Sequence, residues 1–214
     1  MRNQCLAGLA LACAITHASA LAQRGAIVGT VRVADAPVSG GGLYLVSVAG
    51  AASPAVAPMA VDVDQRDLRF VPRVIAVPPG SHVSFLNSDP VMHNVFHPSP
   101  RLPGFDLGMY PQKESRSFTF GNEGAFLILC HVHPEMVGYI VVVASPYRAV
   151  SDDDGRFRME GVLPGIYRLR TWHRRLKPHE QTVTVAADGV VHIDLSLAFG
   201  SPTEPRTSDR QGPQ

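Results

Sequence analysis

The stretch that most constrains this chain is residues 130–136, where Cys130, His133 and Met136 stand at a Cys-x-x-His-x-x-Met spacing. A thiolate, an imidazole and a thioether are soft or borderline metal ligands. This mixture favours copper over zinc, because a thioether adds little to a zinc site. A blue-copper site needs two imidazoles, one thiolate and a weak axial thioether. The spacing therefore predicts a copper site that still lacks one histidine.

The segment before this loop predicts where the thiol points. Residues 125–130 are apolar, and Phe126, Ile128 and Cys130 share one face of a β-strand because side chains alternate along it. Burial of the two apolar side chains makes this face the core. The Cys130 thiol is thus predicted to point inward.

His93 is the candidate for the missing imidazole. It follows a proline turn and opens the short apolar segment 95–96, so the backbone on both sides fixes its position. A rigid metal ligand requires such support. We expect Asn94 to hydrogen-bond across to the Cys130 loop as a brace, the alternative being an ordinary turn amide.

The other histidines nearby are not predicted to be ligands. His82 lies on the mainly polar face of the alternating segment 81–87, and we expect it and His97 at the surface. His131 directly follows Cys130, a position that could lead to a second copper cluster in an oxidase. Such clusters need several His-x-His pairs, and His131/His133 is the only pair in the chain. We therefore predict a solvent-facing or bracing role for His131 and no enzymatic activity.

The N-terminus predicts export. Residues 1–22 combine Arg2, an apolar run at 5–15 and an Ala-x-Ala cleavage site, as a secretory signal does. The run is too short to span a bilayer, and the alternative is a lipid-modified Cys13. Cleavage would remove two of the three cysteines, so that Cys130 is left as a free thiol or a ligand. A periplasmic or secreted location follows.

The composition excludes several classes of partner. The formal net charge is +1, and no long run carries a single sign. Nothing indicates nucleic-acid binding or a polybasic membrane surface. No other apolar run is long enough to span a membrane.

Short β-branched runs separated by Gly- and Pro-rich turns predict an all-β chain. We expect N-terminal strands and a loop over residues 23–58, a metal-binding domain over 59–145 and a second small β-module over 146–199. Residues 200–214 are polar and Pro-rich, and are expected to be disordered. The sequence leaves open which module the N-terminal strands join.

Three motifs together resemble the cupredoxins, the plastocyanin and amicyanin group of blue copper proteins. These motifs are Phe85-Leu86-Asn87, His93-Asn94-Val95 and the Cys130-x-x-His133-x-x-Met136 loop. The resemblance covers roughly residues 61–144 and implies a Greek-key β-sandwich with one type 1 copper ion. The implied ligands are His93, Cys130, His133 and Met136.

The same resemblance implies a carrier of single electrons, with a redox partner that docks near His133. The ring edge of His133 would reach the surface through an apolar patch. Candidate members are Met92, Phe96, Met109 and Pro134, with core packing as the alternative for each. The alternative function is copper binding and delivery without electron transfer.

Residues 151–169 resemble a different family, the carboxypeptidase regulatory-like domain. They include the run Ser-Asp-Asp-Asp-Gly-Arg-Phe-Arg-Met and, further on, Pro-Gly-Ile-Tyr-Arg-Leu. This resemblance implies a transthyretin-like β-sandwich, usually non-catalytic. The two modules together resemble exported proteins of the methylamine-utilisation type.

Overall fold

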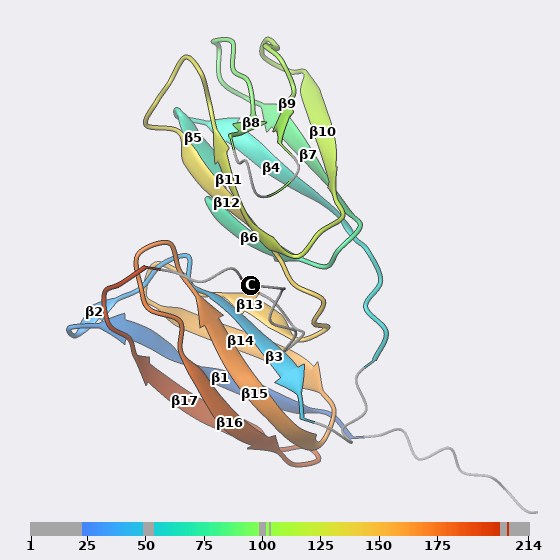
Figure 1. Cartoon of the computed structure of the whole chain (residues 1–214), viewed down its shortest axis with the longest axis vertical. Helices are drawn as coiled ribbons and strands as arrows, with labels where there is room; N and C mark the ends of the chain where they lie inside the picture. Colours follow the sequence, from blue (N-terminus) through green and yellow to red (C-terminus); the bar gives the residue numbers. More distant parts are fainter. Residues whose placement is uncertain (1–22, 49–53, 99–101, 103, 202–204, 206–214) are drawn as a thin grey trace, which may run out of the picture.

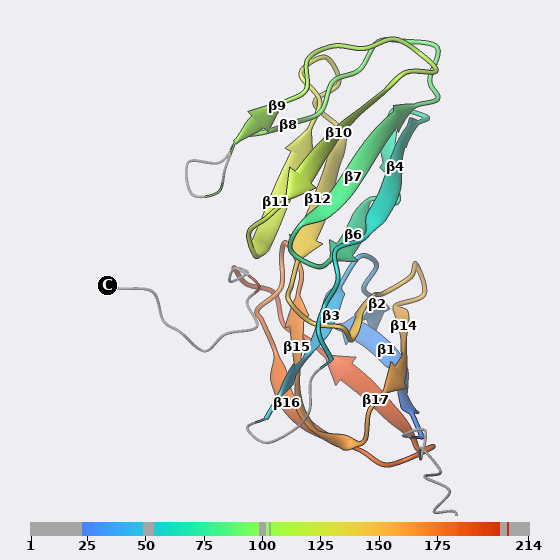
Figure 2. The ribbon, with the colours of Figure 1, turned by 90° about the vertical axis from the view of Figure 1, so that its right-hand side faces the viewer.

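The chain forms two β-sandwiches that stack end to end (Figures 1 and 2). The computed structural model describes residues 23–48, 54–98, 102, 104–201 and 205. Over these residues there is no helix, hence none that could cross a membrane. The predicted all-β class is confirmed. The predicted signal at 1–22 and nearly all of the tail at 200–214 lie outside the described residues.

The middle of the chain builds one of the two sandwiches, here called the central sandwich. Its first sheet has the order β10 (Ser115–Phe120), β7 (Ser81–Asn87), β4 (Ala60–Arg66), β5 (Arg69–Val71). Its second sheet has the order β6 (Val74–Val77), β12 (Val137–Val142), β11 (Gly124–Leu129), β8 (Phe96–His97), β9 (Phe105–Asp106). Strand β4 runs parallel to β7, and β6 runs parallel to β12, as in a Greek key rather than a simple meander.

Alternating side chains explain why these strands form a sandwich. In β7, Val83 and Phe85 are fully buried while His82 is exposed, and in β11 Phe126 and Ile128 are buried. Cys130 follows β11 on the same face and is 4% exposed. The predicted inward direction of its thiol is confirmed, as is the surface position of His82.

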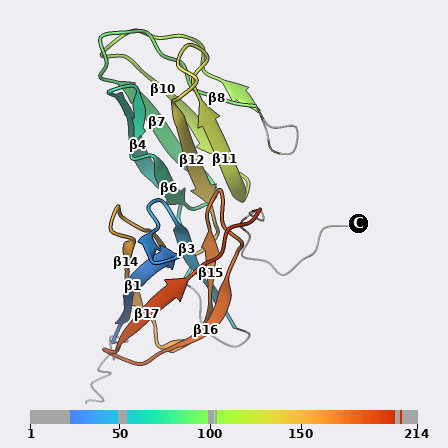
Figure 3. The same ribbon diagram turned by 90° about the vertical axis from the view of Figure 1, so that its left-hand side faces the viewer.

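Strands from both ends of the chain build the terminal sandwich (Figure 3). One sheet has the order β14 (Arg156–Val162), β1 (Gly25–Val33), β17 (Val190–Ser196), with β2 (Ala36–Pro37) beside β1. The other has the order β13 (Arg148–Val150), β3 (Gly42–Ser47), β15 (Gly165–Trp172), β16 (Glu180–Val185). The N-terminal strands thus pair with C-terminal ones, which answers the question that the sequence left open.

A small apolar cluster joins the two sandwiches. The second half of β12, residues 140–142, is buried on both faces. Ile140 and Val142 point into the core of the central sandwich, whereas Val141 packs against Tyr44 and Trp172 of the terminal sandwich. The junction is therefore a buried contact between β12 on one side and β3 and β15 on the other.

The Pro- and Gly-rich segment 97–112 contributes to the second sheet and to the position of His93. Strand β9 pairs with β8, and Tyr110 makes an isolated bridge to His93. The prediction that His97 lies at the surface is wrong, because it is only 5% exposed. Its ring packs against Phe126, and its Nδ1 lies 2.8 Å from the carbonyl oxygen of Leu127.

Candidate metal centre

Two loops at one end of the central sandwich bring three side chains together. His93 lies between β7 and β8, while Cys130 and His133 lie between β11 and β12, at the end remote from the terminal sandwich (Figure 1). The backbone of His93 is held by two hydrogen bonds with Tyr110, of 3.2 Å and 2.8 Å. The ligand candidate is thus fixed by a bridge on a sheet edge, as a rigid metal site requires.

The side-chain atoms form a compact triangle. The Nδ1 atoms of His93 and His133 lie 3.0 Å apart, and the Cys130 Sγ lies 3.8 Å from each of them. Metal bonds of about 2.0 Å to nitrogen and about 2.3 Å to sulfur place neighbouring ligand atoms about 3 to 4 Å apart. The triangle therefore fits one shared metal ion without a change of backbone, and two imidazoles with one thiolate are a trigonal copper donor set.

Met136 lies in the same region of the core. Its side chain is 0% exposed and belongs to the same buried cluster as Cys130, and its backbone N–H donates to the carbonyl oxygen of His133. That hydrogen bond closes the ligand loop into a tight turn. The role of the Met136 thioether as an axial ligand stays a prediction.

Asp89 braces His93, a contact that the sequence analysis did not find. Its Oδ2 lies 2.9 Å from His93 Nε2, and both residues are buried. Burial alone would raise the pKa of Asp89, but hydrogen bonds from the Leu68 amide, His93 and the Asp67 amide lower it. The resulting carboxylate accepts the proton of Nε2, which leaves the Nδ1 lone pair of His93 directed at the triangle.

The sequence carried only a weak signal for this brace. Asp89 stands four residues before His93, inside the segment Asn87-Ser88-Asp89-Pro90, which has the composition of an ordinary turn. Only its spacing of four residues from His93 indicated that Asp89 could also contact a ligand.

Asn94 ties the two loops together, as predicted. Its Oδ1 accepts a 2.7 Å hydrogen bond from the backbone N–H of His131, and its Nδ2 donates to Asp106. The His131 ring stacks on Phe96 at 3.8 Å, lies 2.9 Å from the Asp106 carboxylate and keeps about half of its side chain exposed. The expected solvent-facing position of His131 is confirmed.

Comparison with known proteins finds a similarity for the part of the chain that carries this site. The family described as "Copper binding proteins, plastocyanin/azurin family" matches residues 57–143. No curated protein matches the chain.

Among solved structures, the chain is 28% identical to a mutant of amicyanin in its reduced state, over 39% of this chain and 81% of that one, with a TM-score of 0.37. It is 20% identical to a purple cupredoxin from Nitrosopumilus maritimus, over 38% of this chain and 98% of that one, with a TM-score of 0.35. It is 26% identical to a Cu-containing nitrite reductase from Thermus scotoductus SA-01, with a TM-score of 0.37. That match covers 45% of this chain and only a quarter, 25%, of the reductase. Residues 57–143 thus match the plastocyanin/azurin family of copper-binding proteins, and within them His93, Cys130 and His133 form a donor group that fits copper.

Proposed function

We propose that this protein is an exported electron carrier that holds one type 1 copper ion and passes single electrons between redox partners. The buried triangle of His93, Cys130 and His133 carries this proposal. Met136 is the proposed axial ligand. When bound, copper supplies a one-electron Cu(II)/Cu(I) couple.

The residues around the triangle suit electron transfer better than copper delivery. Delivery needs exposed, exchangeable ligands, whereas Cys130 is 4% and His93 0% exposed. Asp89 holds the His93 ring and Asn94 holds the Cys130 loop, so the ligands keep their positions in both oxidation states. A site that does not rearrange exchanges electrons with a small reorganisation energy.

A partner is proposed to dock over His133, which is partly exposed while His93 is fully buried. Exposed apolar side chains flank the ligand loops: Met92 at 49%, Met109 at 41% and Val132 at 50%. Exposed apolar groups that are grouped on one end of a domain are typical of a docking surface. Of the other candidates, Pro134 is exposed, whereas Phe96 is half-buried under the His131 ring.

We further propose a periplasmic or secreted location and no catalytic activity. His131, the residue that could lead to a second copper cluster, is paired with Asp106 at the surface. The assignment of the second module to the carboxypeptidase regulatory-like family, and of the whole chain to the methylamine-utilisation type, stays a prediction.

Titration of the purified mature chain with Cu(II) tests the proposed function. We expect an intense blue thiolate-to-copper absorption band and a small copper hyperfine splitting in electron paramagnetic resonance at one equivalent. Both signals should disappear in Cys130→Ser, because the band requires the thiolate. Reversible one-electron reduction of the loaded protein should follow.

A colourless complex, or an ordinary copper resonance that survives Cys130→Ser, would contradict the blue-copper site. A blue complex that cannot be reduced reversibly would instead favour copper binding and delivery.

A further inference from the structure

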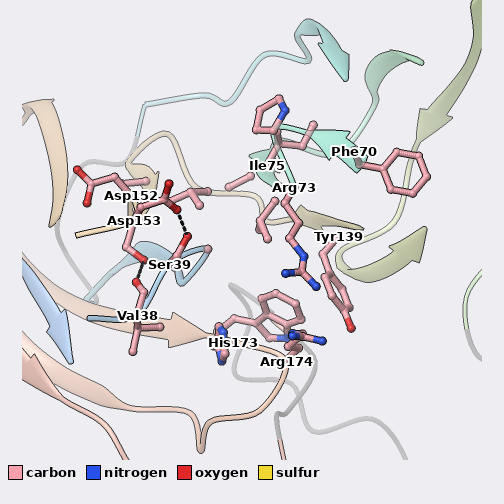
Figure 4. Close-up of a pocket in the computed structure, with 18 of the residues that line it drawn as sticks. Val38, Ser39, Phe70, Arg73, Ile75, Tyr139, Asp152, Asp153, His173 and Arg174 are labelled. Carbon is pink, nitrogen blue, oxygen red and sulfur yellow. Dashed lines mark hydrogen bonds between the residues drawn. The ribbon is translucent and has the colours of Figure 1, made fainter. Parts of the chain in front are cut away.

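A groove runs along the junction of the two sandwiches, and none of the proposed copper ligands lines it. Its volume is about 1530 Å³, and both sandwiches line it. Figure 4 shows two distinct ends: Asp152, Asp153 and Ser39 gather at one, and Arg73, Tyr139, His173 and Arg174 at the other.

The second end of the groove, here called the arginine end, combines cations from both sandwiches. Arg73 comes from the loop before β6 in the central sandwich, whereas His173, Arg174 and Arg175 follow β15 in the terminal sandwich. Arg69, on β5, lines the same groove. Because both groups line the same groove, they form one positively charged region across the junction.

These arginines differ from most others on the surface. Most arginines elsewhere pair with a carboxylate, as Arg158 does with Glu160 and Arg66 with Asp64. Within the described part of the chain, no carboxylate lies within ion-pair distance of Arg73, Arg174 or Arg175. Among the described residues, the Arg73 guanidinium donates one hydrogen bond, from Nε to the carbonyl oxygen of Val137.

The acidic residues of the groove do not neutralise the arginine end. Asp153 accepts a hydrogen bond from the Ser39 hydroxyl, and Asp152 accepts two from the backbone amides of its own turn. Both lie at the opposite end in Figure 4. The remaining acid, Glu135, is exposed and lines the groove from within the loop 130–136 that carries the copper ligands.

Burial and the positive charge of the arginine end lower the pKa values of groups within it. Burial, and then the nearby charges of Arg174, Arg175 and Arg73, lower the pKa of His173 to about 4. Burial and repulsion by Arg174 also lower the pKa of Arg73. Like charges that are gathered in a half-enclosed groove cost free energy, and a bound anion would remove this cost.

We propose that the arginine end binds a multivalent oxyanion, such as a phosphate or a polycarboxylate, which bridges the two sandwiches. Guanidinium groups present planar forks of N–H donors that match the oxygens of such anions. Arg73 would hold the anion from the central sandwich, and Arg174 and Arg175 from the terminal one. The nearby rings of Tyr139 and Trp172, 5.2 Å apart, close the apolar side of the site.

Calorimetric titration of the mature, copper-loaded chain with inorganic phosphate, at constant ionic strength, tests this proposal. We expect saturable binding of one phosphate, and about tenfold weaker binding in Arg174→Ala, because a charge-assisted hydrogen bond is lost. Arg158→Ala is the matched control, since it removes an exposed arginine that is paired with Glu160, and should bind like the wild type. Citrate in place of phosphate distinguishes a polycarboxylate site from a phosphate site.

A second measurement follows the His173 imidazole by nuclear magnetic resonance. Bound phosphate should raise its pKa from about 4, because the anion offsets the neighbouring arginine charges. Three results would overturn the proposal. They are non-saturable binding of both anions, an equal loss of phosphate affinity in the Arg174 and Arg158 variants, and a His173 pKa that phosphate does not change. None of these arginines belongs to the copper ligand group, so these results are independent of whether the protein binds copper.

Discussion

Replacing Asp89 with asparagine is expected to weaken copper binding by about 10- to 100-fold. The Asp89 carboxylate accepts the proton of His93 Nε2 at 2.9 Å and two backbone amides, those of Asp67 and Leu68. An asparagine side chain retains only one acceptor oxygen, so it cannot serve all three donors. His93 then loses the partner that fixes its ring and its tautomer. Competition for Cu(I) and Cu(II) with a chelator of known affinity measures the effect.

Asp106→Asn provides the matched control. Asp106 Oδ2 makes the same 2.9 Å contact, but to His131, which is half-exposed and outside the ligand triangle. Its Oδ1, which an asparagine retains, accepts from Asn94 and from the Gly108 amide. We expect the copper affinity of the Asp106→Asn protein to stay within about threefold of the wild type. A hydrogen bond outside the ligand group affects metal affinity chiefly when it orients a ligand. Equal losses in the two variants would show that Asp89 acts through general stability rather than through the orientation of His93.

Gly29→Ala is expected to destabilise the terminal sandwich by about 3 kcal/mol or more, or to prevent its folding. Gly29 lies in β1, directly opposite Ile193 of the parallel strand β17. A Cβ at this position would lie 1.7 Å from the carbonyl oxygen of Ile193 and 2.6 Å from its carbonyl carbon. Because these are backbone atoms, no side-chain rotation relieves the overlap, and the two strands must move apart. Denaturant unfolding measures the loss.

The chain contains one tryptophan, Trp172, and it is buried at the junction of the sandwiches, so its fluorescence reports this transition. Gly121→Ala is the control, because a Cβ there meets no atom within 4 Å. Its free energy of unfolding should change by no more than about 0.5 kcal/mol. A Gly29→Ala protein with the midpoint of the wild type would refute the close approach of β1 and β17.

The metal centre could largely be predicted because its signals are local. Three of the proposed ligands fall within seven residues, and the alternation of Phe126, Ile128 and Cys130 gives the direction of the thiol. His97 shows where this logic fails. It begins a Pro-rich segment and therefore looks exposed, but its burial is decided by Phe126, about thirty residues away.

The strand pairing of the terminal sandwich could not be predicted for a similar reason. Strand β1 pairs with β14 and β17, whose residues stand more than a hundred positions further along the chain. Its β-branched run fits any half-buried strand, so the pattern indicates a strand but not its neighbours. Strands β1 and β17 are parallel, so no tight turn joins them, and the sequence contains no turn signal that would indicate their pairing.

The pairing of β3 with β13 has a consequence for how the molecule assembles. The Leu45 amide donates to the Tyr147 carbonyl oxygen at 2.9 Å, and the Ser145 hydroxyl donates to the Leu45 carbonyl oxygen. The two strands thus pair like those of a β-hairpin, and the segment that connects them contains the entire central sandwich. Closing a loop of about a hundred unfolded residues is entropically costly. A folded insert holds its two ends near each other, so that the central sandwich, once formed, acts as a short turn and brings β3 and β13 of the terminal sandwich together.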